Sequence, residues 1–237
     1  MSVRMSARLA CVARFVPAGS VVADIGTDHA YLPVYLVRNR IAGRVVAGEV
    51  SRGPYGIAIE AVRGAGLENQ IEVRLGDGLQ VISPGEVNVV VLAGMGGRTI
   101  RDILTTGRPV LEGVERLILQ PMRDAALVRR WLVENGWQMI DEDMVLEDNH
   151  YYVIIVSRPG REKITDRIVF ELGPRLLENR SAVFRKFLLK RRADIGAVLS
   201  ELKTARGTRA LEKIIRIQKE ADRIEEVLNN WPSGQRT

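Results

Sequence analysis

Acidic residues and glycines occur together at four places in the first half of the chain. The first is the segment DIGTDH at residues 24–29, the second is Glu49, the third is GDG at residues 76–78 and the fourth is AGMGG at residues 93–97. Glu49 falls 25 residues after Asp24, a spacing at which an acidic side chain can accept hydrogen bonds from both hydroxyls of a ribose. Glycines let the backbone pass close to a ligand. Together, the four segments indicate a nucleoside-binding site.

The charge of the first segment distinguishes between nucleoside cofactors. Dinucleotide-binding folds use the same ribose-binding acid, but they need a longer glycine fingerprint that seats a pyrophosphate on a helix N-terminus. Here Asp28 stands in the corresponding loop, where it would repel a pyrophosphate and would suit the sulfonium and amino groups of S-adenosylmethionine. Residues 94–98 (GMGGR) also lack the Gly-Lys-Ser/Thr ending of a phosphate-binding P-loop. The sequence therefore favours S-adenosylmethionine.

The elements that position these residues follow from the hydrophobic pattern. Apolar, β-branched runs predict strands, and apolar residues at three- and four-residue spacing predict helices. The predicted strands cover residues 20–25, 44–50, 71–75, 87–92, 116–119, 138–147 and 151–157. The predicted helices cover residues 5–16, 31–39, 54–65, 124–135 and a segment that begins with 99–104. This alternation predicts a doubly wound α/β fold with a parallel sheet, closed by an antiparallel edge hairpin. The candidate ligand residues then lie at the carboxyl ends of the strands, where such sheets bind ligands.

The segment after residue 160 has a different character. Two long amphipathic helices are predicted on either side of Gly207, preceded by a shorter helix that begins at Pro174. The apolar residues that recur at helical spacing are Phe184, Phe187, Leu188, Ile195, Val198, Leu199, Leu202, Leu211, Ile214, Ala221, Ile224 and Leu228. We expect an antiparallel coiled-coil hairpin. The sequence therefore predicts a ligand-binding domain over residues 1–160 and a helical coiled-coil domain over residues 161–237.

The basic charge of the chain is confined to this second domain. Residues 1–160 have a net charge of −1, whereas residues 161–237 have a net charge of +7. Such an excess suits a module that contacts a polyanion, and a solvated helical surface is the alternative interpretation. Clustering at the base of the predicted hairpin favours contact with a nucleic-acid backbone. The cluster consists of Arg185, Lys186, Lys190, Arg191 and Arg192.

The composition excludes several classes of protein. With 46% hydrophobic and 27% charged residues, the chain is not disordered, collagen-like or a disulfide framework. The single cysteine, Cys11, can form neither an internal disulfide nor a metal site. No apolar run reaches the roughly 18 residues that a membrane span needs, and the N-terminus does not have the pattern of a secretory signal. We expect a cytoplasmic protein that has no membrane or metal partner and is a monomer.

Five motifs resemble those of one known family. They are VADIGTDHAYLP (22–33), AGEV (47–50), GDGL (76–79), LAGMGG (92–97) and LILQP (117–121). They are similar to motifs of the bacterial tRNA adenine N1-methyltransferases that modify adenine 22, which belong to the class I S-adenosylmethionine-dependent methyltransferases with a Rossmann-like sheet. The resemblance covers nearly the whole chain. It implies that residues 1–160 bind S-adenosylmethionine and methylate tRNA, and that residues 161–237 contact the tRNA.

The resemblance also implies roles for individual residues. It places the cofactor against Gly26, His29, Glu49, Val50, Asp77, Gly78, Ala93, Gly94 and Met95, with Arg8 at its carboxylate. Asp24 either joins this set or satisfies backbone amides at the end of its strand. The expected catalytic residues are Asp28, which would accept a hydrogen bond from the adenine amino group, and Tyr31, which would stack on the unstacked base. Residues 148–152 (DNHYY) depart from the acidic-glycine-lysine segment of the family.

The implied reaction is an in-line transfer of the sulfonium methyl group to adenine N1. Because N1 already carries a lone pair, orientation and desolvation matter more than a strong base. One alternative is a class I methyltransferase that acts on another RNA or another substrate, although the basic helices argue against a small metabolite. A second alternative is a non-catalytic RNA-binding protein with a degenerate nucleotide fold, against which the presence of Asp28 and Glu49 argues.

Overall fold

The structure is a computed structural model that describes residues 5–202 and 208–231 of the chain. It divides into two compact units, Met1–Lys163 and Ile164–Thr237, and each unit is described by itself. Within the described residues, no helix is both long enough and apolar enough to span a lipid bilayer.

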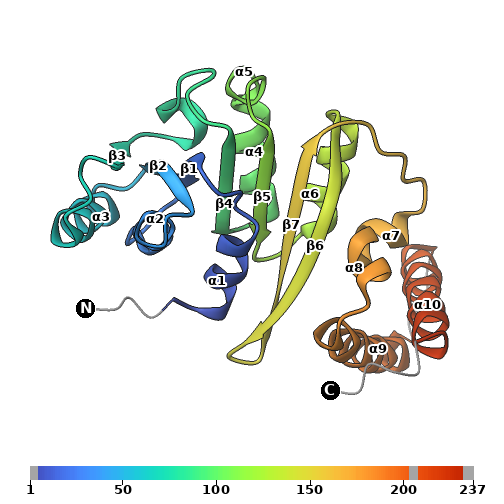
Figure 1. The fold of residues 1–237 in the computed structure, drawn as a ribbon. Helices are drawn as coiled ribbons and strands as arrows, with labels where there is room; N and C mark the ends of the chain where they lie inside the picture. Colours follow the sequence, from blue (N-terminus) through green and yellow to red (C-terminus); the bar gives the residue numbers. More distant parts are fainter. Residues whose placement is uncertain (1–4, 203–207, 232–237) are drawn as a thin grey trace. The chain divides into compact units, whose positions relative to one another are not determined.

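The first unit is built around one sheet. Its strands, all within the described residues, are β1 (Ser20–Ile25), β2 (Ala42–Glu49), β3 (Ile71–Leu75), β4 (Val89–Met95), β5 (Arg116–Pro121), β6 (Trp137–Glu147) and β7 (His150–Pro159). They are arranged in the order β3-β2-β1-β4-β5-β7-β6 (Figure 1). The first five strands are parallel, and β7 pairs antiparallel with both β5 and β6. The predicted doubly wound fold with an antiparallel edge hairpin is therefore confirmed.

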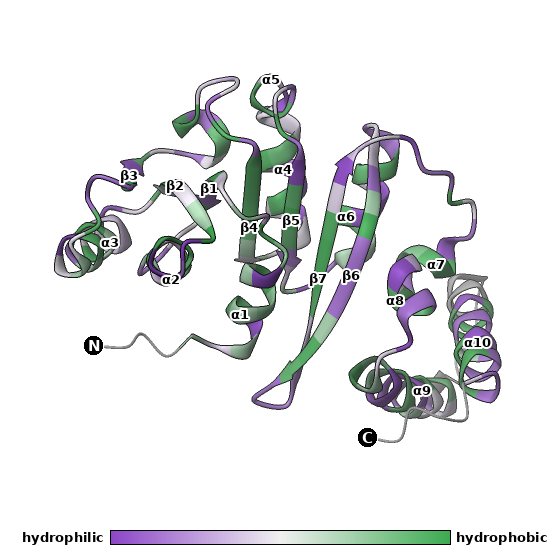
Figure 2. Cartoon of the chain, in the orientation of Figure 1, coloured by the Kyte–Doolittle hydropathy of each residue, from purple (hydrophilic) through white to green (hydrophobic). Residues whose placement is uncertain are grey.

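Helices connect the strands. They are α1 (Ala7–Arg14), α2 (Tyr31–Arg38), α3 (Arg52–Ala65), α4 (Gly97–Thr106), α5 (Arg108–Leu111) and α6 (Ala125–Glu134), together with the 3₁₀ turn η1 (Gly78–Val81). The central strands are apolar on both faces because helices cover both faces: residues 89–92 of β4 are almost completely buried, and Figure 2 colours β4 and β5 mainly as hydrophobic. The pattern did not predict η1 or α5, since each is only four residues long.

One strand ends differently from the prediction, and the difference shapes the site. We expected a strand over 87–92, but β4 runs on to Met95. Ala93 pairs with Gln120 and Met95 with Pro121, so that Gly94 is an extra residue in the ladder. Gly94 has a φ of +79°, a backbone conformation that glycine adopts without strain. The bulge therefore gives the carboxyl end of β4 a bend that the apolar pattern alone did not reveal.

The β6–β7 hairpin is much longer than its neighbours. It pairs continuously out to Glu147 and His150, whereas β5 contacts β7 only over residues 117–119, and Figure 1 shows its tip extending past the other strands. Asp148 and Asn149 form the tip with φ values of +48° and +61°, as a two-residue turn with two left-handed positions requires. The hairpin thus provides an arm against which α1 packs.

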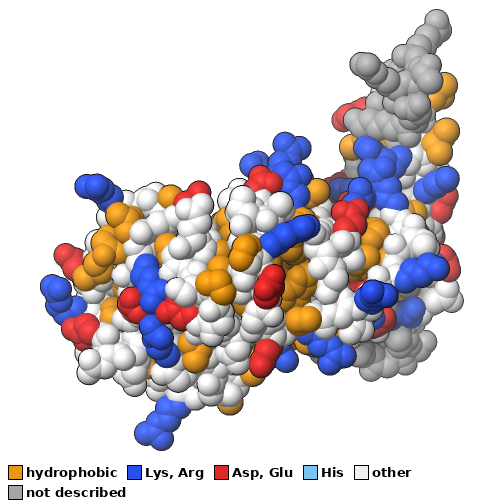
Figure 3. Space-filling view, turned by 90° about the horizontal axis from the view of Figure 1, so that it is seen from above, with side chains coloured by type: hydrophobic (Ala, Val, Ile, Leu, Met, Phe, Trp, Pro, Cys, Tyr) orange, Lys and Arg blue, Asp and Glu red, His pale blue; other side chains and the backbone are white. Residues whose placement is uncertain are grey.

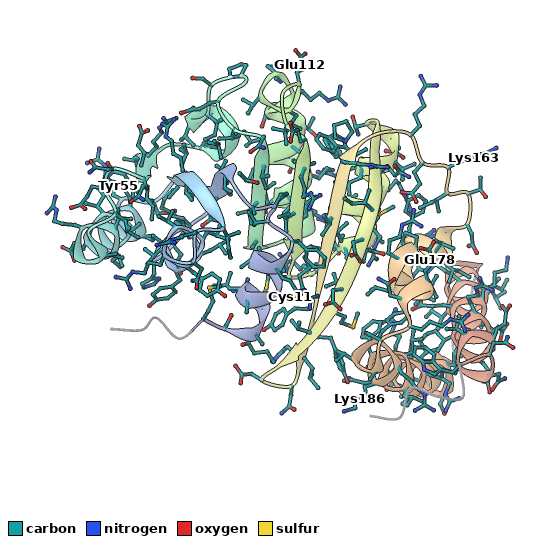
Figure 4. The ribbon with its side chains drawn as sticks, viewed as in Figure 1. Cys11, Tyr55, Glu112, Lys163, Glu178 and Lys186 are labelled. Atoms are coloured by element: carbon teal, nitrogen blue, oxygen red, sulfur yellow. The ribbon has the colours of Figure 1, made fainter. Side chains whose placement is uncertain are left out.

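Helix α1 is fixed to this arm by polar contacts. The backbone N–H of Ala7 donates to Glu147 Oε1 at 2.6 Å, and Arg14 forms an ion pair with Asp143. Cys11, labelled in Figure 4, is buried, and its thiol lies 3.5 Å from Asp143 Oδ2. Burial and, next, the charge of Asp143 raise the pKa of Cys11 to about 12, so the thiol stays protonated and donates to the carboxylate.

Acidic and basic side chains of the first unit neutralise one another. Arg44 and Arg74 form ion pairs with Glu72 and with Glu86 at 2.6–3.3 Å. Figure 3 shows one face of the molecule, on which blue and red side chains lie among each other. This arrangement agrees with the near-zero net charge of residues 1–160.

The second unit is helical. It comprises α7 (Arg167–Leu172), α8 (Pro174–Asn179), α9 (Ala182–Leu202) and α10 (Thr208–Asn229) within the described residues. Helices α9 and α10 pack against each other, as predicted, and Gly207 lies outside the described residues. In α10 the buried residues are Ile224 and Val227, whereas Leu211 is 56% exposed.

The expectation that Leu211 belongs to the buried seam was therefore wrong. The packed part of α10 is its C-terminal half, next to which the Trp231 ring lies 6.4 Å from Phe184. Whether the two helices supercoil stays a prediction.

Candidate active site

A cavity of about 390 Å³ opens at the carboxyl ends of β1 and β4, beside α1. Eight of the residues predicted for the site line it: Arg8, Asp24, Gly26, Asp28, His29, Tyr31, Ala93 and Gly94. Its other lining residues are Met5, Ser6, Leu9, Thr27 and Leu32. Residues from four separate parts of the chain thus meet here, because β1 is the strand at which the sheet order reverses.

The loop after β1 has an unusual backbone. Gly26, Asp28 and Ala30 all have φ between +54° and +77°. At Gly26 a Cβ atom would lie 2.6 Å from Met95 Cε, so glycine is also required by space. Left-handed conformations cost a residue such as Ala30 about 1–3 kcal/mol and persist where the surroundings hold them. The N–H groups of Gly26 and Thr27 both donate to the carbonyl oxygen of Gly48, which fixes the loop against β2.

Asp24 lies at the floor of the cavity and is only 5% exposed. Its Oδ2 accepts a hydrogen bond from the hydroxyl of Thr27 at 2.7 Å, and no bond to a backbone amide is found for it among the described residues. Burial raises the pKa of Asp24 to about 6; the Thr27 hydrogen bond lowers it, Glu49 raises it and Arg8 lowers it. A bound cation would favour the charged form of this carboxylate.

The buried Asp24 carboxylate makes stability depend on pH. Because the folded protein holds this proton more tightly than the unfolded chain does, the contribution is complete below the unfolded pKa and is lost as pH rises through about 6. Without ligand, raising the pH from 5 to 8 should lower the free energy of unfolding of the wild type by on the order of 1 kcal/mol more than that of Asp24→Asn. Urea unfolding at both pH values measures this, and parallel pH profiles for the two proteins would contradict it.

Glu49 is 7% exposed and does not line the cavity. Its Oε1 accepts from the N–H groups of Val50 and Ser51 at 2.9 and 3.0 Å, and its Oε2 accepts from the N–H of Asp28 at 3.3 Å. The carboxylate therefore joins the end of β2 to the loop after β1. Each oxygen has two lone pairs, so these bonds leave capacity for a ribose hydroxyl.

Four other predicted cofactor residues also lie outside the lining of the cavity. Val50 is 62% exposed after β2, Asp77 precedes η1 and Gly78 begins it, and Met95 ends β4 with its Cε against Gly26. The structure places these residues at strand ends as predicted, but it does not bring them into the same cavity. Their contact with a cofactor stays a prediction.

Gln120 is the site residue that the sequence interpretation missed. It is completely buried at the end of β5, and its Oε1 accepts from Arg8 Nη1 at 2.6 Å and from the N–H of Gly94 at 3.0 Å. Its Nε2 lies 3.7 Å from the sulfur of Met122. One side chain thus connects α1, the β4 bulge and β5. The signal was a polar residue within the buried run LILQP, which was quoted as a motif but given no role.

Arg8 has a second contact, with the edge hairpin. Its guanidinium lies 5.7 Å from the centre of the Tyr152 ring, within the range of a cation–π interaction. With Gln120 on one side and Tyr152 on the other, the Arg8 head is held over the cavity next to Gly94. A Cβ atom at Gly94 would approach Arg8 Nη1 to 3.4 Å, so glycine keeps this passage open.

Asp28, His29 and Tyr31 stand at the mouth of the cavity. His29 Nδ1 lies 2.9 Å from Asp28 Oδ2, and the rings of His29 and Tyr31 stack with centroids 5.3 Å apart and an interplanar angle of 12°. Tyr31 is 46% exposed, and the Asp28 side chain is 66% exposed. An acceptor and a flat aromatic surface therefore face solvent together, where a base could enter.

Helix α9 carries the predicted basic cluster, and its members differ in their contacts. Arg191 pairs with Glu220 at 2.7 Å, Lys190 with Asp194 at 2.8 Å and Arg192 with Glu225 at 3.8 Å. For Arg185 and Lys186 no ion pair is found among the described residues, and both are exposed; Lys186 is labelled on α9 in Figure 4. These two are the best candidates for contact with an external anion.

The fold and this cavity define a Rossmann-like class I methyltransferase. Residues 5–155 match the family described as "Methyltransferase domain". The tRNA (adenine(22)-N(1))-methyltransferase of Bacillus subtilis (strain 168) is 39% identical over 227 residues, which is 94% of each chain. The chain therefore belongs to the tRNA (adenine(22)-N(1))-methyltransferase family, as the sequence motifs predicted.

Solved structures agree with this assignment. The crystal structure of the B. subtilis m1A22 tRNA methyltransferase TrmK superposes with a TM-score of 0.87 at 37% identity, covering 95% of this chain and 99% of that one. Streptococcus pneumoniae Sp1610 in complex with S-adenosyl-L-methionine superposes with a TM-score of 0.85 at 36% identity, covering 94% of this chain and 99% of that one.

Proposed function

We propose that this protein transfers the methyl group of S-adenosylmethionine to N1 of adenine 22 in tRNA. The observation that carries the proposal is the cavity at the ends of β1 and β4, which combines two carboxylates, an arginine and two glycine passages in a chain of this family. In this proposal residues 1–160 perform the methyl transfer and residues 161–237 contact the tRNA. The protein would act in the cytoplasm, where tRNA is the substrate.

The residues present fit S-adenosylmethionine. Arg8 would hold its carboxylate, and Asp24 and Asp28 would face its ammonium and sulfonium charges across the cavity that all three line. Glu49 would accept from the ribose, and the remaining predicted residues would surround the nucleoside: Gly26, His29, Val50, Asp77, Gly78, Ala93, Gly94 and Met95. When bound, the cofactor supplies an electrophilic methyl group. The protein supplies binding, orientation and exclusion of water.

At the mouth of the cavity the chain's own groups would orient the target base. Asp28 would accept a hydrogen bond from the exocyclic amino group of adenine, which increases electron density at N1. Tyr31 would stack on the base, which must leave its position in the tRNA to arrive here. The Asp28–His29 contact and the His29–Tyr31 stack hold both groups in place for this task.

The test is methyl transfer from labelled S-adenosylmethionine to unmodified tRNA, followed by mass spectrometry of the nucleosides. We expect a 1-methyladenosine peak that disappears when adenine 22 of the tRNA is replaced by guanine. A peak that survives this replacement would assign the enzyme to another position. Binding of the cofactor without any methylation of tRNA would assign it to another substrate.

The exposed basic pair on α9 gives a prediction for tRNA binding. The double variant Arg185→Glu/Lys186→Glu should bind tRNA about tenfold or more weakly, and its dependence on salt should fall by about one power per lost phosphate contact. Fluorescence anisotropy over a salt series measures both. The matched control is Arg216→Glu/Lys219→Glu on α10, which changes the net charge equally at two other exposed positions. Equal losses for the two double variants would show that only overall charge matters.

A further inference from the structure

A second cavity lies next to the first, between α2 and α3. It has a volume of about 320 Å³, at the lower end of the range of small-ligand sites. Its lining residues are His29, Tyr31, Val34, Arg38, Ala61, Gly64 and Ala65. His29 and Tyr31 also line the reaction cavity, so the two cavities share a wall made of two stacked rings. We call the second cavity the α2–α3 groove.

The floor of the α2–α3 groove is shallow and smooth. It comes from the last turns of α3, where Ala61, Gly64 and Ala65 have small side chains or none. A Cβ atom at Gly64 would meet nothing within 4 Å, so the space above this residue is open. On the opposite side stands the shared aromatic wall. A flat ring can therefore enter between an aromatic face and a small-residue floor.

The charges on the two sides of the shared wall differ. The reaction cavity contains Asp24 and Asp28, which disfavour an anion. The α2–α3 groove contains no acidic residue among the residues that line it, and Arg38 stands exposed there at the end of α2. An anionic phosphate is therefore favoured on the groove side of the wall and disfavoured on the other.

We propose that the α2–α3 groove binds the nucleotide adjacent to the target adenine in the tRNA chain. Its base would stack on the outer side of the His29–Tyr31 wall, and Arg38 would face its phosphate. The proposal rests on the proposed function, since it requires adenine in the reaction cavity. Two consecutive nucleotides are joined by a single phosphodiester, and the two cavities are separated by only the His29–Tyr31 wall. A base on each side of this wall satisfies that connection.

A size series at Gly64 tests the groove without touching the reaction cavity. Gly64→Phe should fill the groove and raise KM for tRNA about tenfold, the effect expected for loss of one stacked base. Gly64→Ala is the matched control and should resemble the wild type, because its Cβ has free space. Both substitutions favour the helix relative to glycine, so folding should be retained. Affinity for S-adenosylmethionine, measured by calorimetry, should not change. An unaltered KM in Gly64→Phe would overturn the proposal.

Abasic tRNAs identify what the groove holds. Two tRNAs are prepared, each lacking the base on one side of adenine 22, and their methylation and binding are measured with the wild type and with Gly64→Phe. For one of the two, the wild type should lose about tenfold in kcat/KM while Gly64→Phe loses nothing further, which is the coupling expected for a direct contact. Equal losses in both proteins would exclude a neighbouring base from the groove.

The same measurements separate this proposal from the proposed function. If the wild type methylates no tRNA, the proposed function fails first, and the anisotropy data still report whether the missing base and Gly64→Phe are coupled in binding. If the wild type methylates adenine 22 and the coupling is absent, only the groove assignment fails.

Discussion

Asp28→Asn should lower kcat for tRNA methylation by about 10²- to 10³-fold, the range that a positioned acid–base group contributes. The side chain lies at the mouth of the reaction cavity, exposed and held by His29, where it can accept from the adenine amino group. Asparagine keeps the size of the side chain and tolerates the left-handed φ of +54° at this position, but it loses the negative charge. Single-turnover methyl transfer to tRNA measures the chemical step.

The same variant distinguishes a catalytic role from a cofactor-binding role. If Asp28 faces the adenine, calorimetry should give a Kd for S-adenosylmethionine within about twofold of the wild-type value, since less than 0.5 kcal/mol is then lost. Asp28→Ala should give the same kinetic loss together with lower stability, because alanine is disfavoured at positive φ. A large loss of cofactor affinity in Asp28→Asn would move Asp28 to the cofactor, and an unaltered kcat would remove it from the reaction altogether.

The parts of the site that the sequence could predict are those carried by local patterns. The strand pattern placed Asp24, Glu49 and the glycine segments at the carboxyl ends of parallel strands, and the topology then brings strand ends together. The glycines at 26 and 94 were expected because the backbone needs them, and both have positive φ. Short-range chemistry is written within a few residues of the chain, so a sequence motif can reveal it.

The parts that could not be predicted depend on contacts between distant residues. Gln120 gains its role only because Arg8, 112 residues earlier, and Gly94 both donate to it. Charge clustering on α9 likewise did not show that Arg191 is neutralised by Glu220, 29 residues later. The α2–α3 groove depends on small residues of one helix facing rings of another. Hydrophobic period and local composition contain none of this information.

Gln120→Leu should weaken the binding of S-adenosylmethionine by about 100-fold. Leucine fills nearly the same volume, but it leaves the Gly94 N–H and the Arg8 guanidinium without their acceptor. Leaving a buried donor unsatisfied costs about 1–3 kcal/mol, and two such losses correspond to roughly two orders of magnitude in affinity. Isothermal titration calorimetry measures the change, and thermal unfolding without ligand checks that the fold is retained.

Gln120→Glu is the matched control, because a carboxylate keeps the acceptor for both donors and gains a charged partner in Arg8. This variant should bind within a few-fold of the wild type, whereas a variant that fails only through altered packing would not be rescued in this way. The demethylated product S-adenosylhomocysteine adds a second check. It lacks the sulfonium charge but keeps the carboxylate that Arg8 is proposed to hold. If Gln120 acts by positioning Arg8 and Gly94, the leucine variant should lose affinity for both ligands equally. A loss confined to S-adenosylmethionine would instead place Gln120 near the methyl group.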